Sequence, residues 1–571
     1  MLNWLHLSIL LKPSYIELIC VGEKMKKSPL VYIFIVVCWI CIASILVWKT
    51  VDISLGLYND ISVELWKKIV TGVMLYGNCL FLLYFWLNAV KDLMFSIFFI
   101  FLNRKIKKIY ADYDAECQDK TKKVLLLYCT CNDFNEDALL ESSKQDYVNT
   151  KVVILDDSSK PDYIERIDDF AKNNKFQVVR RENHSGFKAG NLNNYLQNIN
   201  PDDYDYLAVL DSDERIPSNF VSKILTYFEK DKNIGAVQAA HVATNGSNVF
   251  QSMLGMCVKS NGKICQIMKN FYGSSSLFGH GMMISKECYK KVNGFPEVVA
   301  EDISISVKIR DAGFKIVFAS NVVCKEEFPT DYLSLKKRQC KWTQGNVEYM
   351  KKYNKEITHS KIKWFEKLDL KLSHYSLPII PILSLFLVIN TLTLGFLNCT
   401  PYGYGLWFII LLTVFLLSPL IPDIFTYANT KNMWLIIPYF ILNMITYASM
   451  SPMMISTVVL GIFGKKARFI ITPKETKHIS FCEIIKASWI SVIFGLGIAV
   501  ATYFAYHSIV PTLILSLCCA LCPIVILLAN ISTNNTKALE RTNNVDNKET
   551  ASDDGNMQFE NQNFDGTSSG A

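Results

Sequence analysis

Two carboxylates close the apolar run in "YLAVLDSD". Residues 206–210 are apolar, as a buried strand requires, and Asp211 and Asp213 follow with one serine between them. Like charges this close repel each other, and burial raises that cost. A divalent cation would offset the repulsion, and hard oxygen ligands select Mg²⁺ or Mn²⁺. The D-x-D pattern therefore predicts a metal site that carries a diphosphate, although the same pattern also arises by chance in acidic loops.

Two further acid pairs stand in similar positions. Asp156 and Asp157 end the run "KVVILDD", and Glu301 and Asp302 follow a glycine-rich segment. A carboxylate in the second of these pairs is suited to general base catalysis. A helix N-terminal cap explains the Glu301–Asp302 pair equally well from the sequence alone.

Two segments offer cations and an aromatic ring. "GFKAGNLN" at 186–193 places Lys188 between two glycines, which permit a close approach of the backbone to a ligand, although a structural turn also accounts for them. "RQCKWTQG" at 338–345 places Trp342 beside two cations. A tryptophan face stacks well on a sugar ring, but a tryptophan buried in the core is the commoner case.

These residues need a scaffold that brings them together. Strand-like runs at 123–130, 151–157, 176–181 and 206–213 alternate with polar, helical stretches such as 160–174. Such alternation predicts a parallel sheet with helices on both faces. Ligands bind beyond the carboxyl ends of such strands, where both aspartate pairs would lie.

The remaining sequence is typical of a membrane protein. Half of the 571 residues are hydrophobic. Windows of about 20 residues with almost no charge are long enough to cross a bilayer core. They lie at 31–48, 69–90, 376–397, 404–425, 487–506 and 510–529. The net charge of +7 gathers near their ends, which favours the positive-inside rule over nucleic-acid binding and places the soluble domain in the cytoplasm.

Taken in order, these motifs resemble the processive family-2 glycosyltransferases, the cellulose synthase and hyaluronan synthase group, over residues 120–530. "FIITPK" at 469–474 is similar to the F-x-V-T-x-K gating loop of the cellulose synthases. The chain departs from the group in its Q-x-x-R-W motif, where Arg338 and Lys341 replace Gln and Arg. A lysine meets a diphosphate as a point charge, without the bidentate fork of arginine. Ala300 stands where a Thr is common.

The resemblance implies a role for each motif. Asp302 is the catalytic base, and Asp211 and Asp213 carry Mg²⁺ or Mn²⁺ on the diphosphate. Trp342 and Glu301 bind the acceptor. The implied nucleotide-binding residues are Asp156, Lys188, Asp211, Lys341, Phe469, Thr472 and Lys474. The implied partners are a UDP-sugar donor, a growing glycan and the lipid bilayer, with no nucleic acid; a homo-oligomer is left open.

The resemblance also implies an α-helical integral membrane protein with an inserted cytoplasmic α/β domain of the GT-A, Rossmann-like class, in the plasma membrane. We expect these parts: an extension (1–24) upstream of a natural-looking start at Met25, two transmembrane helices (25–90), an interfacial helix (91–108), the catalytic domain (109–358), an interfacial amphipathic helix (359–375), two transmembrane helices (376–425), interfacial or re-entrant helices (433–463), the gating loop (464–482), two transmembrane helices (484–529) and a disordered tail (530–571).

The expected activity is polymerisation of a β-linked extracellular or capsular polysaccharide, with UDP-glucose as donor and with synthesis coupled to export. UDP-N-acetylglucosamine, or two alternating sugars as in hyaluronan, remain alternatives. A non-processive transferase that adds one sugar to a lipid is the nearest rival, because the Trp motif is altered. A transporter with an inactive domain is a more distant one, because such domains lose the metal-binding acids or the base, and all are present here.

Overall fold

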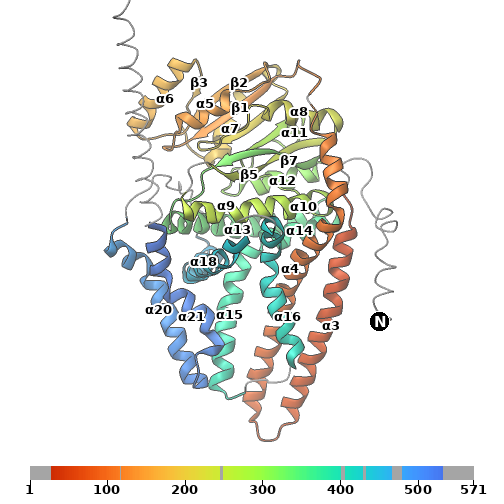
Figure 1. The fold of residues 1–571 in the computed structure, drawn as a ribbon, viewed down its shortest axis with the longest axis vertical. Coiled ribbons are helices and arrows are strands. Elements are labelled where there is room, and N and C mark those ends of the chain that lie inside the picture. The colour runs from red at the N-terminus through yellow and green to blue at the C-terminus, as the bar shows by residue number, and fades with distance from the viewer. Residues whose placement is uncertain are drawn as a thin grey trace, which may run out of the picture.

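The computed structural model describes residues 27–115, 117–244, 248–399, 405–428, 433–465 and 479–530. A sheet domain lies at one end, a layer of helices lies beneath it, and long helices extend away from that layer (Figure 1). Residues 1–24, the tail beyond 530, and the gating-loop residues Phe469, Thr472 and Lys474 lie outside the described part of the chain.

The sheet has seven strands, in the order β3-β2-β1-β4-β6-β5-β7. Their bounds are Val124–Thr130 (β1), Thr150–Asp156 (β2), Gln177–Val179 (β3), Tyr206–Asp211 (β4), Ile234–Ala243 (β5), Met282–Ser285 (β6) and Lys315–Glu326 (β7). The first four strands are mutually parallel, so the carboxyl ends of β2 and β4 lie at one edge on either side of β1. The sequence prediction for these strands is confirmed within a few residues.

The expectation of an all-parallel sheet is wrong. Strand β6 runs antiparallel to both of its neighbours, β4 and β5. It has only four residues and follows a glycine-rich loop, so its sequence carries no alternation from which it could be recognised. The sheet is therefore mixed, within the α/β class that the sequence predicts.

Alternating side chains of the strands pack on opposite layers of helices. Leu126 and Tyr128 of β1 belong to the core beneath α5 (Glu136–Ser143), α6 (Pro161–Asn174) and α8 (Phe220–Lys230). Leu125 and Leu127 belong to the core beneath α7 (Phe187–Asn198), α11 (Lys286–Lys291) and α12 (Glu301–Asp311). This two-residue period is what a strand buried on both faces requires.

A layer of helices joins the sheet domain to the long helices. It contains α9 (Val249–Asn261), a π-helical turn η2 (Gly262–Gln266), α10 (Ile267–Tyr272), α13 (Tyr332–His359) and α14 (Trp364–His374). Short 3₁₀ turns occur at Pro201–Asp203, Ser418–Leu420, Met433–Leu435 and Val510–Thr512.

Six helical segments in the described residues are long and apolar enough to cross a membrane. They are Leu30–Asn59 (α3), Leu65–Asp112 (α4), Ser376–Phe396 (α15), Gly405–Tyr427 (containing α16, Gly405–Leu417, and α17, Ile421–Tyr427), Phe481–Tyr506 (α20) and Val510–Asn530 (containing α21, Leu513–Ala520). Helices α18 (Ile436–Ser449) and α19 (Ser451–Ile462) form a pair bent by 42°, as either a broken span or a re-entrant loop would be.

The interfacial helix expected at 91–108 is not a separate element. Helix α4 runs without a break from Leu65 to Asp112. Residues 91–112 contain no proline or glycine, so nothing in the sequence ends the helix there. The charged Lys91 forms an ion pair with Asp92 at 3.2 Å. The second apolar segment and the basic segment after it form one continuous helix.

Candidate active site

Lys188 and Asp211 form the centre of the site. Gly186, with φ of +72°, precedes the first turn of α7 and so brings Lys188 to the carboxyl end of β4. The Lys188 ammonium donates to Asp211 Oδ1 and, at 2.8 Å, to the carbonyl oxygen of Gly279. Burial alone would lower the pKa of Lys188, but Asp211 and Glu301 hold it well above its usual value. Lys188 is therefore a fixed positive charge.

The two aspartates of the D-x-D motif differ in exposure. The side chain of Asp211 is 41% exposed, whereas Asp213 is buried and its Oδ2 accepts a hydrogen bond from the backbone N–H of Glu327 at 3.1 Å. Asp211 is thus the more accessible of the two and is paired with Lys188, whereas Asp213 is anchored to the end of β7. Two oxygen donors in this arrangement suit Mg²⁺ or Mn²⁺.

Asp156 and Asp157 are each paired with an arginine. Arg180 Nε lies 2.7 Å from Asp156, and Arg181 holds both oxygens of Asp157, at 2.9 and 2.6 Å. Asp156 is 1% exposed. These arginines, which follow β3 in "FQVVRR", were not among the predicted site residues. The signal was present, because a parallel pairing of β2 with β3 places the residues after both strands side by side.

Glu301 and Asp302 are the first two residues of α12. Neither is the N-cap, which is Ala300, so the capping explanation does not describe them. Burial is the main cause that raises the pKa of both groups; for Glu301 the neighbouring Asp302 adds to it, and the pKa reaches about 7. The backbone N–H of Ile303 donates to Asp302 Oδ1 at 2.8 Å. A buried carboxylate with a raised pKa is suited to accept a proton.

Gly279 connects the two halves of the site. Its carbonyl accepts from Lys188, and its φ of +89° is one that side-chain-bearing residues rarely adopt. A Cβ built on it would lie 3.6 Å from both Asp302 Cβ and Glu301 Oε1. The ion pair and the candidate base therefore face each other across one glycine.

Helix α13 contributes Lys341 and Trp342. Burial lowers the pKa of Lys341, while the nearby charges of Asp211 and Glu301 act to raise it. One turn further on, the backbone of Gly345 packs against Ala300, directly before Glu301. Trp342 is 43% exposed, and the Arg338 guanidinium lies 4.6 Å from its ring centre. An exposed ring held by a cation can stack on a ligand.

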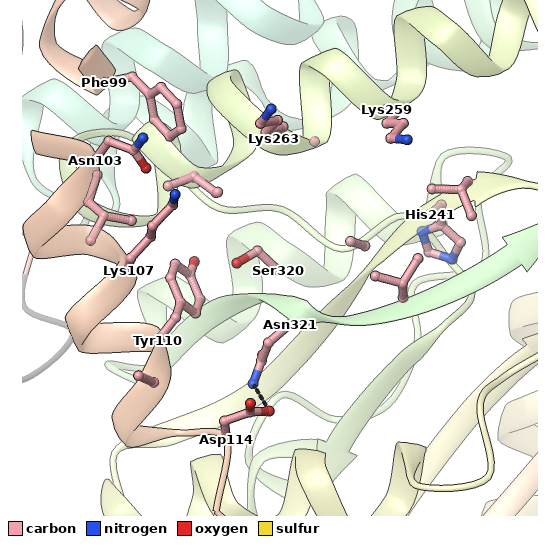
Figure 2. A pocket seen from close by; sticks show the side chains of 17 residues that line it. Phe99, Asn103, Lys107, Tyr110, Asp114, His241, Lys259, Lys263, Ser320 and Asn321 are labelled. Carbon is pink, nitrogen blue, oxygen red and sulfur yellow. Dashed lines mark hydrogen bonds between the residues drawn. The ribbon is translucent and has the colours of Figure 1, made fainter. Parts of the chain in front are cut away.

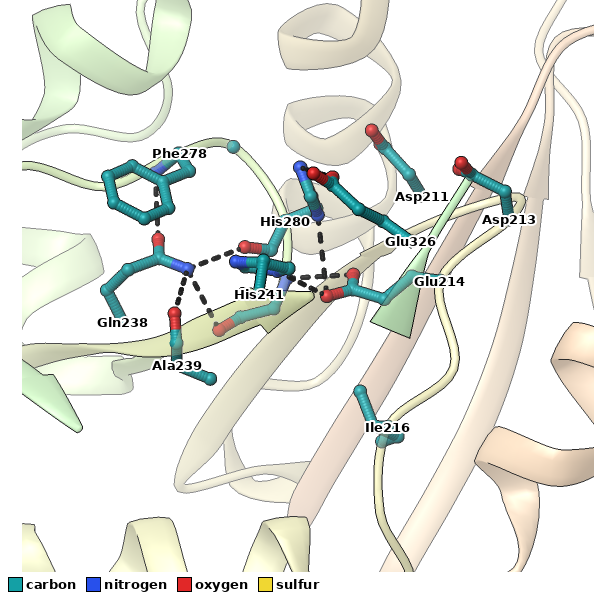
Figure 3. A network of polar contacts seen from close by, with 12 residues as sticks. Asp211, Asp213, Glu214, Ile216, Gln238, Ala239, His241, Phe278, His280 and Glu326 are labelled. Carbon is teal, nitrogen blue, oxygen red and sulfur yellow. Dashed lines mark hydrogen bonds and ion pairs between the residues drawn. The ribbon is translucent and has the colours of Figure 1, made fainter. Parts of the chain in front are cut away.

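A second polar network lies behind the D-x-D motif (Figure 3). The carboxylate of Glu214 is fully buried and accepts from the backbone N–H of Gly281 at 2.8 Å. His241 Nε2 and His280 Nδ1 lie 2.9 and 3.4 Å from its Oε1, and His280 Nε2 lies 3.2 Å from Glu326. Neither Glu214 nor the histidines were among the predicted site residues. The sequence features that could have indicated them are the acid directly after D-x-D and "GHG" at 279–281.

The pKa values of this network are shifted in opposite directions. Burial alone would lower the pKa of His280, but Glu214 raises it to about 10. Burial alone would raise the pKa of Glu214, but His280 and His241 lower it to about 2. A charged pair next to Asp213 holds the end of the D-x-D loop. The thiol of Cys324 completes a compact Glu214–His241–Cys324 group.

Comparisons with known proteins give a consistent result. The model of Glycosyl transferase family group 2 matches residues 206–450. A probable glucomannan 4-beta-mannosyltransferase of Arabidopsis thaliana is 22% identical over 53% of this chain and 59% of its own length. A poly-beta-1,6-N-acetyl-D-glucosamine synthase of Staphylococcus epidermidis is 25% identical over 45% of this chain and 62% of its own. The chain thus spans about three fifths of the relatives that it matches.

The similarity to solved structures is weaker. A crystal structure of S. aureus TarS 1–349 in complex with UDP overlaps with a TM-score of 0.32 and 14% identity, over 54% of this chain and 93% of that one.

Proposed function

We propose that the chain polymerises a β-linked extracellular or capsular polysaccharide from a UDP-sugar and couples synthesis to export, as the match of residues 206–450 to the model of Glycosyl transferase family group 2 and the similarity to polysaccharide synthases support. The observation that carries this proposal is the position of Gly279, which contacts Lys188 on one side and approaches Asp302 on the other. A charged site for a nucleoside diphosphate and a buried base therefore lie within reach of one sugar.

The residues that would bind the donor have different proposed roles. Asp211 and Asp213 would hold Mg²⁺ or Mn²⁺, which neutralises the leaving diphosphate. The donor chemistry fits, because both groups are carboxylates, although a cation at Asp211 would share that carboxylate with the ammonium of Lys188. Lys188 and Lys341 would contact the phosphates, and Asp156 would hold the uridine. The gating-loop residues Phe469, Thr472 and Lys474 are proposed to close over the nucleotide.

Asp302 would accept the proton of the acceptor hydroxyl as that oxygen attacks C1 of the donor sugar. The C1–O bond to the UDP leaving group breaks in the same displacement, so the anomeric centre inverts and an α-linked donor gives a β-linked product. Glu301 would contact the acceptor, and Trp342 would stack beneath the terminal sugar. The exposed ring of Trp342 supports this role.

We propose glucose as the donor sugar, because the "FIITPK" segment is similar to the gating loop of the cellulose synthases. N-acetylglucosamine is the second candidate, since the name of a bacterial relative includes that sugar. Two alternating sugars, as in hyaluronan, are the third. The altered motif at Arg338 and Lys341 favours a fourth candidate, a non-processive transfer to a lipid acceptor.

We place the protein in the plasma membrane with its catalytic domain in the cytoplasm. The six apolar helical segments and the cations near their ends support this orientation. The donor, the growing glycan and the bilayer are its proposed partners; nucleic acid is not among them. A homo-oligomer is compatible with this arrangement.

The test is synthesis by the full chain in lipid nanodiscs with single UDP-sugars and Mg²⁺ or Mn²⁺. UDP release would be measured, and the product sized before and after treatment with linkage-specific glycanases. We expect a long polymer from one donor. UDP release with only a short lipid-linked product would favour the non-processive transferase. No release from any donor, alone or in pairs, would contradict the proposed donor class.

A further inference from the structure

A cavity of about 560 Å³ lies where helix α4 meets the sheet domain (Figure 2). Its walls are the last turns of α4, the segment from α9 through η2, and strands β5 and β7. His241, at its far end, is the one residue that it shares with the networks described above. The function proposed for the active site does not use this cavity.

In the membrane topology proposed above, the cavity begins near the membrane edge. Phe98 of α4 packs against Phe34 of α3, with ring centres 5.5 Å apart. Phe34 lies one turn inside the start of α3, next to the basic segment that contains Lys27. In that topology Phe99 would lie close to the membrane surface, and Lys107, about 12 Å further along the helix, would lie at the depth of lipid headgroups or just beyond. Ile100 and Phe101 beside it are about half exposed.

The lining combines apolar walls with unpaired cations. Phe99, Ile106 and Ile267 supply apolar surface. Lys107, Lys259 and Lys263 are exposed at the cavity, and in the described part of the chain none of their ammonium groups lies within 4 Å of a carboxylate. Asp114, the acid in the lining, is already paired with Lys223 at 2.7 Å. The charge of the cavity is thus positive and available to a ligand.

The backbone keeps the cavity open. The π-helical turn η2 interrupts the helical ladder between α9 and α10, and such turns are frequent at binding sites. Gly262 begins this turn, and a Cβ on it would meet only the Phe318 ring, at 3.9 Å. A large side chain at position 262 would enter the cavity. Lys259 and Lys263 stand four residues apart, on either side of this glycine.

We propose that this cavity binds an anionic phospholipid of the leaflet that faces the catalytic domain. Its phosphate contacts Lys107, Lys259 and Lys263, and the start of an acyl chain packs against Phe99 and Ile106. Basic pockets at the end of membrane helices bind anionic headgroups in this way. A free phosphate would use the three lysines but leave the apolar wall unused, and this difference favours the lipid.

The test is photo-crosslinking of the full chain in nanodiscs of mixed phosphatidylcholine and phosphatidylglycerol. One lipid at a time carries a diazirine near its glycerol, and labelled peptides are mapped by mass spectrometry. We expect phosphatidylglycerol to label the end of α4 and the α9–η2 segment, and phosphatidylcholine to label them at least roughly tenfold less, since each lysine near the surface favours an anionic headgroup. Equal labelling by both lipids would overturn the proposal.

Three variants make the test specific. Replacing Lys107, Lys259 and Lys263 by Gln should remove the preference for phosphatidylglycerol. Replacing three exposed lysines of the sheet domain by Gln changes the net charge equally and should not; these are Lys172, Lys232 and Lys290. Gly262→Phe retains the cations but fills the cavity, so it should lower labelling even if the triple variant folds poorly. Full labelling of Gly262→Phe would refute the cavity as the site.

A soluble competitor separates the two sources of phosphate. Millimolar inorganic phosphate or glycerol 3-phosphate should leave the labelling unchanged, because neither contacts the apolar wall. Complete displacement by either compound would show a site for free phosphate and contradict the lipid assignment. Labelling is independent of sugar transfer, so its outcome stands whether or not the proposed polymerase activity is found.

Discussion

Lys188 at the start of α7 and Asp211 at the end of β4 form an ion pair on the exposed side of the D-x-D motif. The pair sets the charge of the site before any ligand binds. A divalent cation at Asp211 must share this carboxylate with an ammonium, whereas a diphosphate gains from both cations. Metal and nucleotide should therefore respond differently to the loss of Lys188.

We expect Lys188→Met to weaken UDP binding by about tenfold or more, because a charge-assisted hydrogen bond is lost. The same variant should bind Mn²⁺ more tightly than the wild type when no nucleotide is present, since a competing positive charge is gone. Titration of Mn²⁺ and of UDP separately, by calorimetry, measures both effects. Lys188→Arg retains the charge and serves as the control. A decrease in both affinities would contradict the assignment of Lys188 as a competing charge.

Asp302→Asn should lower turnover by about 10²–10⁴-fold, the usual contribution of a general base. The amide keeps the shape of the side chain and can still accept from the N–H of Ile303. UDP affinity should therefore stay within a few-fold of the wild type. Turnover from radiolabelled donor and UDP binding would be measured on the same preparation. Full activity in Asp302→Asn would remove Asp302 from the role of base.

The activity should fall at acidic pH over a range above that of an ordinary carboxylate. Burial raises the pKa of Asp302, and a protonated Asp302 cannot accept a proton from the acceptor. Glu301, whose pKa is raised to about 7, lies beside it, so the two groups titrate as a unit. The acid limb of kcat/KM should thus lie above the range of an ordinary carboxylate, about pH 4. A limb at about pH 4 or below would contradict a raised pKa of Asp302.

Glu214→Gln should destabilise the catalytic domain by about 3–5 kcal/mol, because it removes the buried carboxylate that both His241 and His280 contact, although the ion pair of His280 with Glu326 remains. A domain of this size should then melt roughly 10 °C lower. Thermal unfolding followed by thiol exposure or by tryptophan fluorescence would report the change. Glu141→Gln removes an acid from an exposed pair with Arg215 and should change the melting temperature little.

The same network predicts how stability depends on pH. The pKa of His280 is raised to about 10, so its contribution is complete below about 6.5, its usual pKa, and is lost as the pH rises through 10. The pKa of Glu214 is lowered to about 2, so its contribution is complete above about 4.5 and is lost as the pH falls through 2. Unfolding measured from about pH 6 to about pH 10 should show a decline in the wild type that is smaller in His280→Gln.

Trp342→Ala should shorten the product more than it slows UDP release. The ring is 43% exposed and held by Arg338, so its removal takes away a stacking surface without opening the core. Stacking of this kind anchors a glycan between successive additions. Product length on a gel, compared with UDP release from the same reaction, gives the result. Trp342→Phe retains a stacking face and should restore most of the length.

Much of the fold was legible in the sequence because its signals are local. The strands before Asp157 and Asp211 are apolar runs that end in carboxylates, and parallel pairing brings such ends to one edge. The long apolar windows predicted the helices that are able to cross a membrane. Lys188 and Asp302 were also chosen from motifs, and the structure brings both to Gly279.

Other features depend on residues far apart in the chain. Strand β6 is too short to be recognised from the sequence. It lies between β4 and β5 in the sheet and pairs antiparallel with both. The partners of Asp156 and Glu214 could not be chosen from local patterns, since Arg180 and His280 lie 24 and 66 residues away and look ordinary in sequence. The structure also decided that α4 is one rod, which forms the wall of the basic cavity.

The sequence by itself thus predicted the class of the domain, the helices that are long and apolar enough to cross a membrane, and the acids and the lysine that the structure brings near Gly279. It did so because these features are encoded locally. The periodicity of buried residues, the length of an apolar helix and a short motif each depend on one continuous stretch of sequence. The tertiary structure decided which charges neutralise one another, which carboxylates are open, and where a cavity remains. Those outcomes depend on distances between segments, which are set only when the sheet and the helices pack together.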